Sequence, residues 1–278
     1  MQSNKTTEAN IHVHSYLANT GEYEKSPHFL PENQNKIKGI LKSITSKLKN
    51  RSVAIDFGCG TGFMTNLIKD LFDKVHGVDI TKDMMKKVDL SSGNIELLEC
   101  FAEDTPFENE FFDFATAYSF MDHLTNYELF LKEAFRVLKK GGIFYSDLNP
   151  NRDFINSMKD IDGSNLQIKL PEIITKEIKG SLYNGQYYND TVNLSEEMVN
   201  LAEPIKSFDL GFSSSEVIEV AKDIGFTNCI IEHDWFLGQA KVMHSQSFDN
   251  ASVIDNYLKS ILPLSSSFYK YLRFIFVK

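Results

Sequence analysis

One stretch of the sequence, residues 53–63, constrains the fold more than any other. It reads VAIDFGCGTGF, a short apolar run containing Asp56 and then glycines at every second position, Gly58, Gly60 and Gly62. Beyond it, apolar side chains recur at the 3.6-residue period of a helix: Phe63, Met64, Leu67, Ile68, Leu71 and Phe72. The pattern predicts a strand that turns directly into a helix over glycines. Because glycine has no Cβ, such a turn lets the backbone approach a ligand closely, as in nucleotide-binding sites.

A second predicted strand, residues 74–78, is followed directly by Asp79. An acidic side chain about twenty residues beyond the first strand, at the end of the second, is placed to bind both hydroxyls of a ribose. The glycines are spaced G-x-G-x-G, whereas a dinucleotide site has G-x-G-x-x-G, and the phosphate-binding pattern G-x-x-x-x-G-K-[ST] is absent. The spacing therefore argues against a nicotinamide-dependent reductase.

In these features the chain resembles the class I S-adenosylmethionine-dependent methyltransferases, whose first motif is an apolar strand, an acidic residue and G-x-G-x-G. The resemblance continues in order along the chain. Residues 102–107, AEDTPF, resemble the family's D-A-E-D-L-P-F segment beside adenine, and residues 136–142, RVLKKGG, resemble R-V-L-K-P-G-G. The matching motifs span residues 53–147 and look most like the small-molecule branch of ubiquinone and menaquinone biosynthesis.

The resemblance implies an α/β fold: a Rossmann-like, seven-stranded, mostly parallel sheet in the order 3-2-1-4-5-7-6, with helices on both faces and an antiparallel last strand. Residues 1–50 are predicted to form an N-terminal helical arm that acts as a lid. Residues 51–148 and 209–278 are predicted to form the methyltransferase core. Residues 149–208 are then an insertion after the fifth strand, which we expect to be a cap over the acceptor. Within it, the run YNGQYY at residues 183–188 indicates a β-hairpin, and a structural excursion that covers the sheet edge is the alternative.

Composition narrows the class of partner. The formal net charge of -9 disfavours DNA or RNA as substrate, because duplex binding usually needs a basic patch. Three scattered cysteines without C-x-x-C spacing, a polar N-terminus and no apolar run long enough for a bilayer predict a cytoplasmic protein without a membrane span. The expected partner is a small-molecule acceptor, and the sequence leaves open whether the chain is a monomer or a homodimer.

The resemblance also implies which residues bind S-adenosylmethionine. Phe101 stands where the family usually has the acidic residue that receives the adenine amino group. The adenine is therefore expected to be held by the Ala102 backbone and the Glu103 carboxylate, with Ile80 against one ring face. The full set of expected cofactor residues is Asp56, Gly58, Cys59, Gly60, Gly62, Asp79, Ile80, Ala102, Glu103 and Ser119.

For the acceptor, four tyrosines are candidate contacts: Tyr16 and Tyr23 from the arm, and Tyr183 and Tyr187 from the insertion. Packing without substrate contact is the alternative for the first two. His123, just after the fourth predicted strand, is the candidate catalytic base. The sulfonium methyl group is already electrophilic, so a base matters only when the nucleophile must lose a proton, as a hydroxyl must. A histidine that only packs or hydrogen-bonds locally is the alternative.

Metal chemistry is not expected. Asp122, Asp147 and Asn149 are loosely similar to the metal ligands of catechol-type O-methyltransferases, but in that family the acidic residue and the asparagine are adjacent, and here Leu148 separates them. His12 and His14 would share a face if extended, yet two histidines alone make a poor metal site.

The leading hypothesis is methyl transfer from S-adenosylmethionine to an oxygen, nitrogen or carbon of a small metabolite. One alternative is a methyltransferase that acts on a protein or on a carrier-bound substrate. Another is a cofactor-binding scaffold without catalysis, which the departure at Phe101 favours and which the intact glycines and Asp79 oppose.

Overall fold

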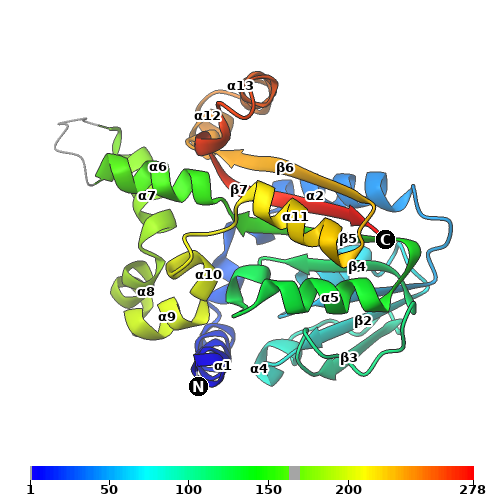
Figure 1. Cartoon of the computed structure of the whole chain (residues 1–278). Helices are drawn as coiled ribbons and strands as arrows, with labels where there is room; N and C mark the ends of the chain where they lie inside the picture. The colour runs from blue at the N-terminus through cyan, green and yellow to red at the C-terminus, as the bar shows by residue number, and fades with distance from the viewer. Residues whose placement is uncertain (1, 163–169) are drawn as a thin grey trace.

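A computed structural model describes residues 2–162 and 170–278. Its centre is one sheet of seven strands in the order β3-β2-β1-β4-β5-β7-β6 (Figure 1). The strands are β1 (Val53–Phe57), β2 (Lys74–Asp79), β3 (Ile95–Glu99), β4 (Phe112–Tyr118), β5 (Leu138–Pro150), β6 (Asn228–Phe236) and β7 (Tyr269–Val277). The pairs among β1 to β5 are parallel, and β7 runs antiparallel to both β5 and β6. The predicted sheet order and the antiparallel last strand are confirmed.

Helices cover both faces of the sheet because its central strands are apolar on both sides. On one face lie α5 (Tyr127–Val137) and α11 (Ser214–Ile224), which share a buried core with the sheet. On the other face lie α2 (Pro31–Thr45) and α3 (Phe63–Ile68), which pack against the sheet in a second buried cluster. Asn126 caps the start of α5, because its side chain accepts hydrogen bonds from the backbone N–H groups of Glu128 and Leu129. The short helix α4 (Lys82–Met85) follows β2.

The N-terminal arm begins with a helix, α1 (Gln2–Thr20), and continues through two 3₁₀ turns, η1 (Tyr23–Lys25) and η2 (Pro27–Phe29), into α2. Ala9, Val13 and Leu17 recur every four residues and form one buried face of α1. This face packs against α9 (Glu196–Ala202), so the arm lies against the insertion. Because the segment is helical, His12 and His14 do not share the face that an extended chain would give them.

Strand β5 extends to Pro150, and beyond it helices are the regular elements in the described residues of the insertion. The insertion comprises α6 (Arg152–Asp162), α7 (Glu172–Leu182), α8 (Asn184–Val192), α9 and α10 (Pro204–Ser207). The predicted hairpin at residues 183–188 is wrong, since this run opens α8. Gly185 lies inside this helix and is not part of a turn. A Cβ on Gly185 would lie 2.9 Å from the backbone oxygen of Glu196, so this glycine allows α8 and α9 to approach each other closely.

Two ion pairs fasten the insertion and the arm to the sheet. Lys270 of β7 bonds Glu177 of α7 at 2.6 Å, and the other carboxylate oxygen of Glu177 accepts the N–H of Gly238. Lys36 of α2 bonds Asp234 of β6 at 2.6 Å. After β6, helices α12 (Gln239–Ser245) and α13 (Phe248–Ser260) project beyond the sheet before the chain returns as β7 (Figure 1).

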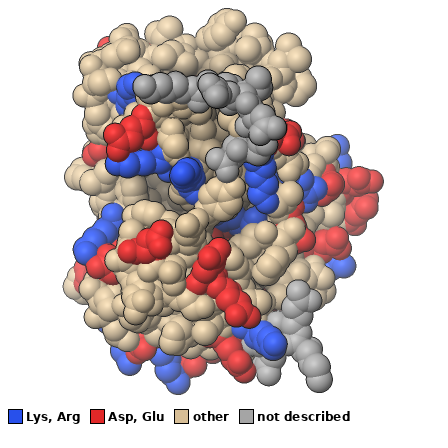
Figure 2. Space-filling model, turned by 90° about the vertical axis from the view of Figure 1, so that its left-hand side faces the viewer, with Lys and Arg blue, Asp and Glu red and all other residues tan. Residues whose placement is uncertain are grey.

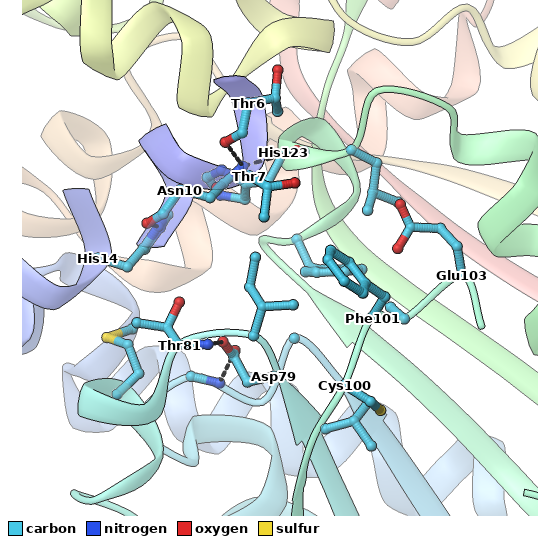
Figure 3. Close-up of a pocket in the computed structure, with 18 of the residues that line it drawn as sticks. Thr6, Thr7, Asn10, His14, Asp79, Thr81, Cys100, Phe101, Glu103 and His123 are labelled. Carbon is cyan, nitrogen blue, oxygen red and sulfur yellow. Dashed lines mark hydrogen bonds between the residues drawn. The ribbon is translucent and has the colours of Figure 1, made fainter. Parts of the chain in front are cut away.

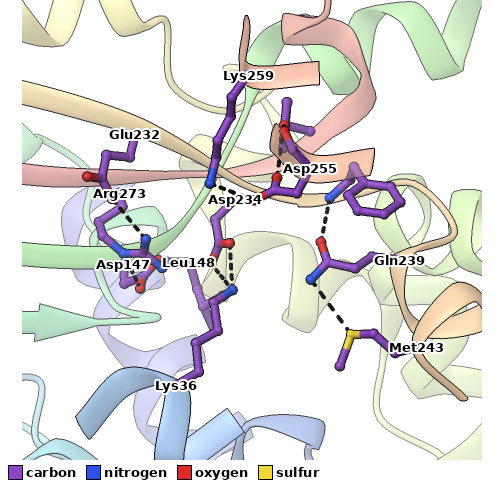
Figure 4. A network of polar contacts seen from close by, with 12 residues as sticks. Lys36, Asp147, Leu148, Glu232, Asp234, Gln239, Met243, Asp255, Lys259 and Arg273 are labelled. Carbon is purple, nitrogen blue, oxygen red and sulfur yellow. Dashed lines mark hydrogen bonds and ion pairs between the residues drawn. The ribbon is translucent and has the colours of Figure 1, made fainter. Parts of the chain in front are cut away.

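A buried ion network joins strands β5, β6 and β7 (Figure 4). The guanidinium of Arg273 donates to Asp147 of β5 at 2.8 Å, to Asp234 of β6 at 2.7 Å and to Glu232 at 3.1 Å. The side chains of Arg273, Asp147 and Asp234 are only 3%, 0% and 6% exposed. Burial alone would raise the pKa of Asp234, but the adjacent Lys36 and Arg273 outweigh it and lower that pKa.

His28 is enclosed by aromatic rings, with those of Phe29 and Phe63 centred 4.5 and 5.0 Å from its own. Burial lowers the pKa of His28 to about 4. Between this pH and the unfolded value of about 6.5, the unfolded chain binds a proton that the folded chain does not, so stability falls as pH falls through this window.

We therefore expect wild type to lose about 1 to 2 kcal/mol more than His28→Phe in free energy of unfolding when pH drops from 7 to 5. Urea denaturation at both values measures the difference. The exposed His12, replaced by alanine, is the control and is expected to behave like wild type. Equal losses in wild type and His28→Phe would show that His28 titrates normally in the folded protein.

Candidate active site

A single pocket brings most of the predicted site residues together (Figure 3). It lies at the C-terminal ends of β1, β2 and β4, where ligands bind in open α/β sheets, and α1 forms one wall. The empty space within the pocket, including open solvent at its mouth, is about 840 Å³. Of the predicted residues, those lining it are Gly58, Gly60, Asp79, Ile80, Ala102, Glu103, Ser119, Tyr23 and His123.

The glycine turn forms one side of the pocket. Gly58, Gly60 and Gly62 all have positive φ, at 64°, 52° and 87°. A Cβ on Gly58 would stand 2.0 Å from the ring of Phe120, and one on Gly62 would stand 2.9 Å from Val88. Side chains are therefore excluded at both positions. Gly60 faces the pocket, whereas Gly62 lies behind it and begins α3.

Asp79 stands at the end of β2 with both carboxylate oxygens fixed. One accepts the N–H of Gly60 at 2.9 Å and the other accepts the N–H of Thr81 at 2.7 Å. Burial raises the pKa of Asp79, although these hydrogen bonds oppose the rise. The carboxylate and the bare glycine backbone meet at one side of the pocket, which fits the ribose of a nucleoside ligand.

Two further predicted cofactor residues lie beneath the pocket rather than on its wall. Asp56 is buried under the turn, where it accepts a hydrogen bond from Thr65 at 2.6 Å, and burial raises its pKa to about 7. Cys59 is buried against Gly77, and burial raises the pKa of its thiol. Both side chains therefore support the turn from behind.

The opposite wall carries Phe101, Ala102 and Glu103 (Figure 3). Phe101 is 53% exposed and lines the pocket where the related enzymes usually have an acidic residue. Burial raises the pKa of Glu103.

His123 ends a 3₁₀ turn, η3 (Met121–His123), that follows β4. Its Nδ1–H donates to the backbone oxygen of Ala202 at 2.8 Å, which ties the turn to the insertion. The carbonyl of His123 accepts a hydrogen bond from the side chain of Asn10 at 3.2 Å. The ring of His14 meets that of His123 edge to face, with centroids 4.8 Å apart. Arm, core and insertion therefore converge at this histidine.

Of the four candidate tyrosines, the structure places Tyr23 on the pocket wall. Its hydroxyl lies 3.5 Å from where a Cβ on Gly60 would stand, and burial raises its pKa. Tyr16 instead donates to the carbonyl of Val192 and joins α1 to α8. Tyr183 and Tyr187 are 38% and 54% exposed and do not line this pocket. Thr6, Thr7, Asn10 and His14 also line the pocket because the arm is helical there, and no pattern in the sequence indicated this position for them.

Two of the three residues considered as metal ligands, Asp147 and Asn149, are hydrogen-bonded to other groups. Asp147 binds Arg273 and the hydroxyl of Tyr145, and Asn149 bonds the carbonyl of Leu272 and Ser146. Asp122 is buried near the insertion, where one of its oxygens has no hydrogen-bond partner. In residues 2–162 and 170–278, no three His, Cys, Asp or Glu side chains are grouped as metal ligands would be.

On the face shown in Figure 2, basic side chains lie around a central hollow and acidic side chains lie beside them. Among the helices the structure describes, none has both the length and the apolar character to cross a membrane.

Comparison with known proteins identifies the central domain. Residues 55–146 match the family model described as a methyltransferase domain. The demethylmenaquinone methyltransferase of Staphylococcus carnosus is 30% identical over 151 residues, which are 51% of this chain and 61% of that protein. The enzyme of the same name from Staphylococcus saprophyticus is 31% identical over 140 residues, which are 47% of this chain and 59% of that one. The chain thus spans about three fifths of the length of the curated relatives it matches.

Solved structures share the fold. A phosphoethanolamine N-methyltransferase from Haemonchus contortus, in complex with S-adenosyl-L-methionine, has a TM-score of 0.54 at 15% identity and covers 92% of this chain and 59% of its own. A possible histamine N-methyltransferase from Thermotoga maritima has a TM-score of 0.53 at 17% identity. The match covers 96% of this chain and 99% of that one.

Proposed function

We propose that this chain, which belongs to the class I S-adenosylmethionine-dependent methyltransferases, methylates a small aromatic acceptor of the quinol class. One observation carries the proposal. The glycine turn and the fixed carboxylate of Asp79 lie in the same pocket as His123, at the C-terminal edge of the sheet. The domain match and the relatives' names support the reaction and the acceptor class.

The residues present fit the cofactor. Asp79 would hold the ribose hydroxyls, and Gly60 would let the cofactor lie against the backbone, while Gly58 makes room for the ring of Phe120. Ile80, Ala102 and Glu103 would hold the adenine, and Ser119 would lie beside the methionine end. Bound there, S-adenosylmethionine would supply an electrophilic methyl group. Tyr23 and Phe120 line the pocket next to the glycines.

His123 has the geometry of a general base. Its Nδ1–H is donated to the backbone oxygen of Ala202, which leaves Nε2 as the nitrogen that can accept a proton. That nitrogen would take the proton from the acceptor hydroxyl as the nucleophile forms. In a quinol, loss of this proton activates both the oxygen and the neighbouring ring carbon, so the assignment holds for O- and for C-methylation.

The lining also bears on the acceptor's charge. In the described part of the pocket wall no Lys or Arg is present, whereas Asp79 and Glu103 are. The phosphorylated amine in one Haemonchus contortus complex therefore has no counterpart among the acceptors we propose. The cysteines, all three free, support a reducing compartment, and we propose the cytoplasm.

The first test is calorimetric titration with S-adenosylmethionine, S-adenosylhomocysteine and NADH. We expect micromolar binding of the first two alone. Binding of NADH alone, or of none of the three, would overturn the proposed cofactor. With the cofactor established, methylation of 1,4-dihydroxynaphthalene, kept reduced under nitrogen, tests the acceptor class.

His123→Ala is expected to bind S-adenosylhomocysteine within about twofold of wild type and to lower kcat about 100-fold, since a positioned base contributes about 10²-fold or more. Calorimetry and a methylation assay separate the two effects. His12→Ala, on the exposed face of α1, is the matched control. Turnover of His123→Ala at the wild-type rate would remove the base assignment.

A further inference from the structure

His14 is a second histidine in the pocket, and the mechanism above does not use it. It comes from α1, whereas His123 comes from the turn after β4, and the two rings meet edge to face. Figure 3 shows His14 and Asn10 on the wall that faces Phe101 and Glu103 across the pocket. Its neighbour His12 points outward from the same helix and is exposed.

Hydrogen bonding fixes which nitrogen of His14 is available. Its Nδ1 lies 2.9 Å from the carbonyl oxygen of Asn10, one helical turn earlier, and must carry the proton because a carbonyl only accepts. Within residues 2–162 and 170–278 the structure assigns no partner to Nε2 of His14 or to Nε2 of His123. Both rings line the pocket, so it contains two adjacent imidazoles of the same tautomer.

His14 remains an acceptor at neutral pH. Burial lowers the pKa of His14 to about 4, and His123 adds to the effect. The groups that face it are His123 on η3, Glu203 between α9 and α10, and Tyr23 on η1, of which Glu203 acts in the opposite direction. Desolvation outweighs that carboxylate, so the ring stays neutral.

The rest of the described lining contains no Lys or Arg. Asp79 and Glu103 are assigned to the cofactor, so the Nε2 atoms of His14 and His123 remain as acceptors for the second ligand. A ligand with hydrogen-bond donors finds partners there, and a ligand with only acceptors leaves these nitrogens without a donor.

We propose that His14 is a positioning and specificity residue for the methyl acceptor, whose second hydroxyl or amino group donates to His14 Nε2 while the first faces His123. The site then selects acceptors that carry two donors on one ring system. The inference rests on the proposed function, because it takes the acceptor to occupy the pocket beside His123. It adds a second recognition point on a helix outside the methyltransferase domain match.

The experiment compares two probes that differ by one hydroxyl. Dissociation constants of 1,4-dihydroxynaphthalene and 1-naphthol are measured by calorimetry on the full chain saturated with S-adenosylhomocysteine. We expect wild type to bind 1,4-dihydroxynaphthalene about 10-fold more tightly than 1-naphthol, because the second hydroxyl adds one hydrogen bond to a buried acceptor. His14→Phe is expected to weaken that compound about 10-fold and to leave 1-naphthol within twofold.

Two further variants separate recognition from packing. His14→Gln, whose amide oxygen reaches near the position of Nε2, is expected to restore at least a third of the preference. His12→Phe is expected to keep all of it. Long-range ¹H–¹⁵N spectra of the histidine rings supply a readout without any acceptor, and His14 is expected to show an unprotonated Nε2 at pH 5.5.

The outcomes distinguish this inference from the proposed function. Binding of S-adenosylhomocysteine with no binding of either naphthol would overturn the quinol class, and this inference with it. Binding of both naphthols with equal weakening by His14→Phe would overturn the role of His14 alone. A protonated His14 at pH 5.5 would do the same.

Discussion

Arg273→Met is expected to remove about 3 to 5 kcal/mol from the free energy of unfolding, because it leaves Asp147 buried without its cation and leaves Asp234 with Lys36 alone. Methionine keeps the apolar stem of the side chain, so the loss reports the charge rather than a cavity. Urea unfolding followed by circular dichroism measures it. If the variant does not fold at all, adding Asp147→Asn removes one stranded charge and is expected to recover part of the stability.

The control is an exposed ion pair. Lys176 and Glu172 are one turn apart on α7, with side chains 76% and 81% exposed. Lys176→Met is expected to change stability by no more than about 0.5 kcal/mol. A loss for Arg273→Met as small as this would mean that water reaches the network and that the three strands are not held by it.

Asp79→Ala is expected to weaken binding of S-adenosylhomocysteine about 100-fold. The ribose would lose its two charge-assisted hydrogen bonds to the Asp79 carboxylate. The N–H groups of Gly60 and Thr81 would also lose their common acceptor. Calorimetry measures the affinity. Asp83→Ala is the matched control, since Asp83 lies four residues further on, in α4, and pairs with Lys86 at the surface.

Gly60→Val tests the same site from the backbone side. Gly60 has a φ of 52°, which valine adopts only with strain. The Cβ of a valine at this position would lie 3.2 Å from the side chain of Met84. We expect no measurable binding. An unchanged affinity in both Gly60→Val and Asp79→Ala, with the fold intact by circular dichroism, would place the cofactor elsewhere.

Local patterns in the sequence selected residues of the glycine turn and Asp79, which the structure brings to one pocket. The glycine turn and Asp79 are adjacent in space because β1 and β2 pair directly and are parallel, so both strands end at the same edge. Residue spacing alone did not determine the order of the strands, which came from the family resemblance and which the structure confirms.

Other features depend on contacts that a linear pattern does not contain. The YNGQYY run predicted a hairpin from its turn residues, but Gly185 is needed for the contact between two helices. The buried face of α1 consists of three apolar residues, Ala9, Val13 and Leu17, and its packing depends on α9, which is far away in the sequence. Asp56 and Cys59 belong to the turn motif, yet they face its underside.

The position of β7 has a consequence for synthesis of the protein. Among the described strands it is the last in the chain, yet it lies between β5 and β6 and supplies the guanidinium for Asp147, 126 residues earlier. At ribosomal rates of about 5 to 20 residues per second, that interval lasts roughly 6 to 25 seconds. During it the nascent chain has an open edge on β5 and a carboxylate without its cation, so it presents a binding site for chaperones and for other unfinished chains.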